Sequence, residues 1–230
     1  MCGRFVATSD PDQLALWFET DDRRTDELPA SYNVAPTMPV YAVAEHAGRR
    51  HLVSFRWGLV PTWADDRKVG ARMINARVET VADKPAFRTA LQRRRCLIPA
   101  DGFYEWRVDQ SGRTPFYIHR DSGAPLAFAG LWEGWKQPDG EWLRTCTIVT
   151  TAATPRLRPL HERMPIVLPA TAWERWLDRE ERRIPAVLPL LARPASDDLT
   201  WHAVSTAVNN VRNDRPDLIA AVDGHSETST

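Results

Sequence analysis

The residue best suited to unusual chemistry is the second of the chain, where Cys2 follows Met1 and precedes Gly3. Methionine aminopeptidases remove an initiator methionine that precedes a small side chain, which would leave Cys2 with a free α-amine beside its thiol. At pH 7 about a tenth of such an amine is neutral, against less than about one part in a thousand of an unshifted lysine. The amine suits imine formation with an aldehyde, and the thiol can then close a five-membered thiazolidine. A chance cysteine after the start codon is the alternative.

A second group of polar residues lies in the segment "MINARVET", where Asn75, Arg77 and Glu79 alternate. In an extended segment these side chains point the same way. An amide beside a guanidinium is suited to holding a substrate oxygen and a phosphate. The alternative is an ordinary polar strand face.

Two further segments carry groups that move protons near neutral pH. Glu105 stands between aromatic residues in "GFYEWR", where partial burial would raise its pKa. The segment "HERMP" contains His161 and Arg163, a proton-transfer group and a phosphate ligand two residues apart. An exposed glutamate and a structural histidine are the alternatives.

No motif predicts a cofactor or a metal ion. "HERMP" is not HExxH, and no other Cys/His spacing is typical of a metal site. The sequence also lacks GxGxxG, P-loop and GxSxG motifs, so nucleotide cofactors and serine-hydrolase chemistry have no support.

Composition predicts one reduced, soluble domain. The length of 230 residues fits a single domain, and 30 Lys+Arg balance 30 Asp+Glu, so any anion site must be a local patch. An odd count of 3 cysteines without an apolar leader favours a cytoplasmic protein. No apolar run approaches the roughly 18 residues of a spanning helix, so no membrane partner is expected. Residues 1–222 are predicted to form the domain, and 223–230 a disordered tail.

Helices are expected at 9–19, 83–95 and 169–181. The first has Asp10 as N-cap before Pro11, and the second has Asp83 as candidate N-cap. The arginines at 93–95 are expected to form a solvated, basic helix end. In the third helix Trp173 and Trp176 share one face.

Most of the remaining chain has β-type patterns. Residues 39–45 and 51–60 are predicted to form a hairpin, residues 95–151 several short strands, and 199–205 a last strand. Cys96 and Cys146 lie in apolar strand patterns and are interpreted as structural. The order of elements predicts an α+β fold with a mainly antiparallel, curved or barrel-like β core and a few peripheral helices.

Several motifs, in order along nearly the whole chain, resemble those of the SRAP family (SOS response-associated peptidase), the abasic-site DNA-crosslinking proteins. They are "MCGRF", "YNVAPT", "WGLVPTWADD", "MINARVET", "RRCLIPADGFYEW", "FAGLWEGW", "CTIVTTAA", "HERMPIVL" and "VSTAVNNVRND".

The resemblance implies a protein that binds single-stranded DNA and captures the aldehyde of an abasic site on Cys2, protecting the lesion during repair. Asn75 would orient the opened sugar, while Glu105 and His161 would move protons in imine formation and crosslink reversal. The implied DNA contacts are Arg4, Asn33, Pro39, Trp63, Arg77, Trp106 and Arg163. Lyase activity could accompany capture, and peptidase activity on other proteins is discounted.

The expected partners are abasic single-stranded DNA and the methionine aminopeptidase that exposes Cys2. The protein is expected to be a monomer, cytoplasmic, and nucleoid-associated when it acts on DNA. One rival hypothesis is an N-terminal-nucleophile amidohydrolase, in which the Cys2 amine is the base for its own thiol. Another is a non-catalytic single-strand-binding module.

Overall fold

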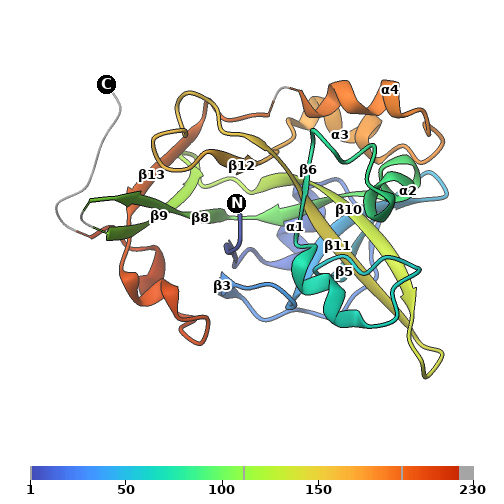
Figure 1. Ribbon diagram of the computed structural model, residues 1–230, viewed down its shortest axis with the longest axis horizontal. Helices are drawn as coiled ribbons and strands as arrows, with labels where there is room; N and C mark the ends of the chain where they lie inside the picture. The colour runs from blue at the N-terminus through green and yellow to red at the C-terminus, as the bar shows by residue number, and fades with distance from the viewer. Residues whose placement is uncertain (1, 111, 193, 223–230) are drawn as a thin grey trace.

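The structure is a computed structural model that describes residues 2–110, 112–192 and 194–222. The tail predicted at 223–230 lies outside the described residues. The described chain forms a closed barrel and an open sheet, with helices against the outside of the barrel (Figure 1). The α+β class with a barrel-like β core is confirmed.

The barrel has the strand order β11-β10-β7-β4-β5. Its strands are β4 (Pro39–His46), β5 (Arg49–Trp57), β7 (Arg95–Ala100), β10 (Leu126–Lys136) and β11 (Trp142–Ala152). Neighbours are antiparallel except β11 and β5, whose parallel pairing closes the ring between Cys146 and Trp57. The β4–β5 turn has φ 53° at Ala47 and 76° at Gly48, as a two-residue type I′ hairpin requires.

Short strands extend the barrel at its edges. β2 (Asp22–Arg23) pairs with β5, while β6 (Asn75–Arg77) and β12 (Arg163–Pro165) both pair with β11. Gly58 (φ 120°) and Gly70 pack backbone to backbone between β5 and β6, where a Cβ on Gly58 would lie 2.6 Å from the Gly70 carbonyl oxygen. That close approach brings β6 back beside β11.

The open sheet is antiparallel and has the order β13-β9-β8-β1-β3. Its strands are β1 (Phe5–Ala7), β3 (Ser31–Val34), β8 (Gly102–Asp109), β9 (Gly112–Arg120) and β13 (Leu199–Ala203). Phe5 pairs with Phe103, and the Phe5 ring lies 5.1 Å from Trp57 and 6.0 Å from Phe128, centroid to centroid. The open sheet thus closes one end of the barrel interior.

Alternating side chains divide the barrel strands between two cores. Ala42, Val53 and Ile148 point inward to the cluster that includes Phe5. Their sequence neighbours Val43 and Leu52 point outward to a second cluster under the helices. This period of two is the expected signature of strands buried on both faces.

The helices cover that outer cluster. They are α1 (Pro11–Trp17), α2 (Pro85–Arg93), α3 (Ala170–Leu177) and α4 (Ile184–Val187), with the 3-10 segment η2 (Leu188–Leu191). The other 3-10 segments, η1 (Arg67–Arg72), η3 (Thr206–Asn209) and η4 (Pro216–Ile219), pack on smaller clusters elsewhere. The Asp10 N-cap is confirmed, as its carboxylate accepts from the N–H groups of Asp12 and Gln13. Trp173 and Trp176 are buried on one face of α3, as predicted.

Two details of the second helix were wrongly predicted. The helix begins at Pro85, so its N-cap is Lys84 and not Asp83. Arg95 belongs to β7 and is 2% exposed. Its guanidinium donates to five backbone carbonyls, those of Leu91, Gln92, Trp176, Asp178 and Glu181. These acceptors close the ends of α2 and α3, which explains why a cation is buried there.

None of the described helices is long and apolar enough to cross a membrane.

Candidate functional site

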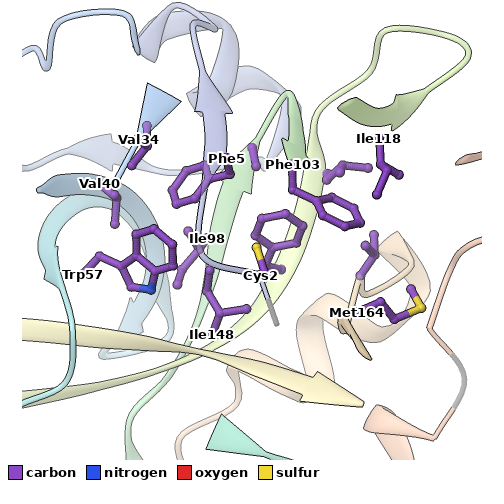
Figure 2. Close-up of a cluster of buried hydrophobic side chains, with 14 of the residues drawn as sticks. Cys2, Phe5, Val34, Val40, Trp57, Ile98, Phe103, Ile118, Ile148 and Met164 are labelled. Carbon is purple, nitrogen blue, oxygen red and sulfur yellow. The ribbon is translucent and has the colours of Figure 1, made fainter. Parts of the chain in front are cut away.

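Cys2 is held where the open sheet meets the barrel. Its side chain is 0% exposed and lies in the cluster that contains Phe103 and Ile148 (Figure 2). Burial raises the pKa of the Cys2 thiol far above its ordinary value of 9.0, and the nearby Glu105 carboxyl raises it further. The thiol is therefore neutral at physiological pH, and less of it ionises than an unshifted cysteine would allow.

Asn75 fixes the backbone of Cys2 from the barrel side. Its Nδ2 donates to the Cys2 carbonyl oxygen at 2.8 Å. The position of Asn75 is set by β6, since it pairs with Ile148, and the Trp57 indole N–H donates to the neighbouring Ile74 carbonyl at 2.9 Å. Asn75 Oδ1 is buried and accepts no hydrogen bond within the described residues. One acceptor next to Cys2 is thus left for a ligand.

Glu105 approaches from the open sheet. The pairing of Phe5 with Phe103 in antiparallel β1 and β8 places Gly3 beside Glu105 when the register is continued. The Glu105 side chain is buried, and this burial raises the pKa of its carboxyl to about 7. The carboxyl can therefore either donate or accept a proton near neutral pH.

His161 completes the group of proton-transfer side chains. Its Nε2 lies 3.9 Å from Glu105 Oε2. The Arg163 N–H donates to His161 Nδ1 at 2.9 Å, which leaves the ring proton on Nε2; the longer 3.1 Å contact with the Arg163 carbonyl would need the other tautomer. Burial lowers the pKa of His161, so the ring is neutral at pH 7.

A cavity of about 580 Å³ opens above these groups. Its lining consists of Gly3, Arg4, Glu105, Trp106, Val108, Arg113, His161 and Asn209. The four predicted catalytic residues therefore come together, with Glu105 and His161 in the wall, Cys2 next to Gly3, and Asn75 bonded to Cys2. Among the described residues no group of three or more His, Cys, Asp or Glu side chains is placed to hold a metal ion.

Comparison with known proteins identifies the family. Residues 1–211 match the family described as SOS response associated peptidase (SRAP). The chain belongs to the SRAP family. This confirms the resemblance found in the sequence.

The SRAP relatives cover nearly the whole chain. The abasic site processing protein YoqW of Bacillus subtilis (strain 168) is 40% identical over 95% of this chain and 99% of its own. The abasic site processing protein YedK of Escherichia coli (strain K12) is 34% identical over 96% of this chain and 100% of its own. The abasic site processing protein HMCES of Xenopus tropicalis is 31% identical over 96% of this chain and 78% of its own.

Solved structures share the SRAP chain's fold. A crystal structure from Bordetella bronchiseptica is 28% identical, with TM-score 0.74, and the match covers 89% of this chain and 100% of that one. Another from Bacteroides thetaiotaomicron has TM-score 0.84, and its match covers 96% of this chain and 100% of that one. At 21% identity the second likeness concerns the fold alone.

The arginines of the SRAP motifs differ in how many hydrogen bonds and ion pairs they already form within the protein. Arg4 lines the cavity, but its guanidinium donates to Asn33 Oδ1 at 2.7 Å and to the Val208 carbonyl at 2.9 Å. Asn33 is itself buried and donates to three carbonyls of the 208–213 segment. Asn33 therefore positions Arg4 and that segment, and its side chain does not line the cavity.

Arg77 and Arg163 flank the site from the barrel side. Arg163 forms a two-bond ion pair with Glu79, at 2.6 and 3.0 Å, and also donates to the Thr150 carbonyl at 2.9 Å. Arg77 is exposed and makes no side-chain hydrogen bond or ion pair with any other described residue. Arg77 is thus the more available of the two for a phosphate.

The predicted aromatic and proline contacts lie in different places. Trp106 lines the cavity, and its indole N–H donates to Asn209 Oδ1 at 2.7 Å. Trp63 is 62% exposed and Pro39 is also exposed, but neither lines the cavity. A DNA strand that contacts all three must extend beyond the cavity.

Sequence reasoning missed Arg113, which lines the cavity with its guanidinium carbon 4.8 Å from the centre of the Trp106 ring. Its positive charge lowers the pKa of Glu105, where it opposes the larger, raising effect of burial. It also lowers the pKa of His161, where burial has the same, larger effect. The available signal was the β8–β9 hairpin register, which pairs Arg113 with Val108. Without that register, "GRTPFYIHR" gives no reason to place Arg113 near Glu105.

Proposed function

We propose that this protein processes abasic sites by binding single-stranded DNA and forming a thiazolidine crosslink between Cys2, freed of Met1, and the ring-opened sugar aldehyde. The observation that carries the proposal is that Glu105 and His161 line one cavity, while Cys2 lies directly behind its Gly3 wall with its carbonyl held by Asn75. Membership of SRAP and the names of the relatives support the substrate class.

The first half of the reaction uses the α-amine. Its lone pair attacks the aldehyde carbon and gives a carbinolamine, with the proton passing from nitrogen to oxygen. Protonated Glu105 then donates to the carbinolamine hydroxyl, which leaves as water, and the nitrogen returns a proton to the Glu105 carboxylate to give the neutral imine. The pKa of about 7 at Glu105 keeps a large protonated fraction available near neutral pH.

The second half uses the thiol. The sulfur adds to the imine carbon, its proton moves to the nitrogen, and the five-membered ring closes with no further leaving group. A buried thiol with a raised pKa is a poor first nucleophile, so the amine acts first. The same raised pKa argues against the amidohydrolase hypothesis, in which the thiol must attack an amide before any amine chemistry.

The free acceptor on Asn75 suits a sugar hydroxyl or the amine. Asn75 Nδ2 holds the Cys2 carbonyl, and Oδ1 of the same amide is buried without a partner among the described residues. We assign it the role of orienting the opened sugar. Glu105 and His161 would also serve the reverse reaction, and a base at this position would permit lyase cleavage by β-elimination from the imine.

The DNA contacts are assigned by availability. Arg77 binds a phosphate next to the lesion, Trp106 and Arg113 face the nucleotide that enters the cavity, and Trp63 and Pro39 contact flanking bases. Arg4 contributes a positive charge at the cavity wall, and Arg163 does so only if its ion pair with Glu79 opens.

The deciding experiment is incubation with a single strand that contains one abasic site, without added reductant, followed by denaturing electrophoresis and intact mass. Wild type is expected to give an adduct of the mass of protein without Met1 plus DNA minus water. Cys2→Ala should give none, whereas the matched control Cys96→Ala should keep it, since Cys96 is buried in β7. No adduct from wild type whose mass confirms loss of Met1 would overturn the proposal.

Two rival outcomes are separable in the same experiment. Persistent strand binding by wild type without any adduct would favour the non-catalytic binding module. An acyl-enzyme mass with small amides would favour the amidohydrolase. The expected aminopeptidase requirement is checked by a chain in which Met1 is retained, which should bind DNA but form no crosslink.

A further inference from the structure

The barrel opens at a second place into a cavity of about 230 Å³. Its floor is made by Ala44, Val53, Phe55 and Trp132, which all belong to or pack on the cluster inside the barrel. Among the described residues, none lines both this cavity and the one beside Cys2. Figure 1 shows β8 and β9 at the left, whereas β10 and β11, which contribute Trp132 and Arg144 to the new cavity, extend to the lower right. We call this second cavity the barrel mouth.

The floor of the barrel mouth is aromatic and partly uncovered. The Phe55 and Trp132 rings are stacked, with centroids 5.2 Å apart and planes inclined by 23°. Of the two stacked rings, Phe55 is buried and Trp132 is only half-buried. Since Trp132 lines the cavity and is only half-buried, part of its indole is accessible to another flat ring.

Three arginines, Arg24, Arg144 and Arg179, surround the aromatic floor. Arg144 stands two residues before Cys146 on β11, so both side chains are on the inner face of the strand. Arg144 is exposed and has no side-chain hydrogen bond or ion pair with another described residue. Its charge is thus available to an anion that enters the mouth.

The carboxylates around the barrel mouth are already used. Asp22 accepts from Arg24 Nε at 3.2 Å and contacts His51 Nδ1. Glu45 accepts from the backbone N–H of Gly48 at 2.6 Å and of Arg179 at 3.2 Å. Arg24 is thus already paired with Asp22, whereas Arg144 has no carboxylate partner among the described residues and is the cation left for an incoming anion.

From this arrangement we infer that the barrel mouth binds one nucleotide, with its base stacked on Trp132 and its phosphate on Arg144. The volume is below the roughly 300–1,000 Å³ of sites that enclose a whole ligand, so it accepts a single ring and leaves the phosphate at the rim. A stacking ring beside a free arginine is the arrangement by which proteins hold unpaired bases without reading their sequence. The inference does not rest on the chemistry at Cys2.

The ligand chemistry is that of a base with a phosphate, supplied either by a free mononucleotide or by an unpaired strand. The test is calorimetric titration of wild type with dTMP, with thymidine and with a short oligo(dT). We expect binding of at least one phosphate-bearing probe and roughly tenfold weaker binding of thymidine, because a hydrogen bond to a charged group is lost. Binding of oligo(dT) alone assigns the strand as source, and binding of dTMP assigns the free nucleotide. No binding of either overturns the inference.

Variants separate the barrel mouth from the cavity beside Cys2. Arg144→Ala is expected to lower the affinity for the phosphate-bearing probe roughly tenfold. The control Arg175→Ala, on the exposed side of α3, should leave that affinity unchanged. If Arg113→Ala weakens binding and Arg144→Ala does not, the nucleotide occupies the Cys2 cavity and the inference is wrong.

Photocrosslinking locates the ring directly. The probe is 5-iodo-dUMP, or 5-iododeoxyuridine within oligo(dT) if only the strand binds, and the modified peptide is identified by mass spectrometry. Modification within residues 126–136 supports stacking on Trp132, and modification of Trp106 instead contradicts it. Arg144→Ala should still form the abasic-site adduct at the wild-type rate, so failure of this inference is distinguishable from failure of the proposed function.

Discussion

The Cys2 cavity and the barrel mouth belong to one β core but treat polar groups in opposite ways. At Cys2, a carboxyl and a thiol are buried, their pKa values are raised, and an amide oxygen has no partner in the described chain. At the mouth, the carboxylates already accept hydrogen bonds, and the groups left to a ligand are a half-buried indole and an exposed arginine. Groups removed from water with raised pKa values suit proton transfer, whereas rings and charges that water can reach suit reversible recognition.

The largest expected effect comes from removing the titrating carboxyl group from the Cys2 cavity, which tests whether this cavity carries the proton transfer. Glu105→Gln is expected to slow adduct formation at pH 7 by about 10²- to 10⁴-fold, the usual contribution of a positioned general acid. The measurement is the single-turnover rate with excess protein. The control Glu141→Gln changes an exposed carboxylate near the β10–β11 turn and should keep the wild-type rate. A Glu105→Gln rate within threefold of wild type would assign the proton transfer elsewhere.

The same substitution should stabilise the protein at high pH. Folding raises the pKa of Glu105 from 4.5 to about 7, so between these pH values the folded state holds a proton that the unfolded state has lost. The free energy of unfolding therefore falls as pH rises through this window, by about 3 kcal/mol in total at about 1.4 kcal/mol per unit.

Urea denaturation at pH 4 and pH 8 measures this effect. The difference in free energy of unfolding between Glu105→Gln and wild type should move by up to about 3 kcal/mol in favour of the variant from the lower to the higher pH. Equal differences at both pH values would show that Glu105 titrates normally. Arg144→Ala should show no such pH-dependent difference, since no described acid that lines the barrel mouth is buried.

The fold and the chemical groups at Cys2 were largely predictable from the sequence, because alternation, turn residues and caps are local. The Arg95 guanidinium was not, since its five acceptors come from the ends of two helices far apart in the chain. Nor was Arg113, whose place depends on a hairpin register. The barrel mouth was missed because its closure rests on the parallel pairing of Cys146 with Trp57, which no local pattern indicates.

Arg113 offers a finer test of the electrostatics at Cys2. Its charge lowers the pKa of Glu105 against the larger effect of burial, so Arg113→Gln should raise that pKa. Glu105 would then stay protonated to higher pH, and the rate of adduct formation should begin to fall at a higher pH than in wild type. Arg113→Lys keeps the charge and should restore the wild-type pH dependence. An equal displacement in both variants would indicate lost packing on Trp106.

The smallest expected effect is on the salt dependence of DNA binding, which tests whether one DNA strand contacts both the Cys2 cavity and the barrel mouth. In a Cys2→Ala background, which keeps binding reversible, each phosphate contact to a single strand contributes about 0.7 to the slope of log affinity against log salt. With a short abasic strand, Arg77→Ala should lower the slope by about this amount. Arg163→Ala should lower it less, because its guanidinium is held by Glu79 and Thr150. Arg144→Ala should leave the slope unchanged, since the mouth shares no lining residue with the Cys2 cavity in the described chain. A reduced slope for Arg144→Ala would mean that the strand bound at Cys2 continues to the barrel mouth, and the two regions would then form one extended DNA-binding surface.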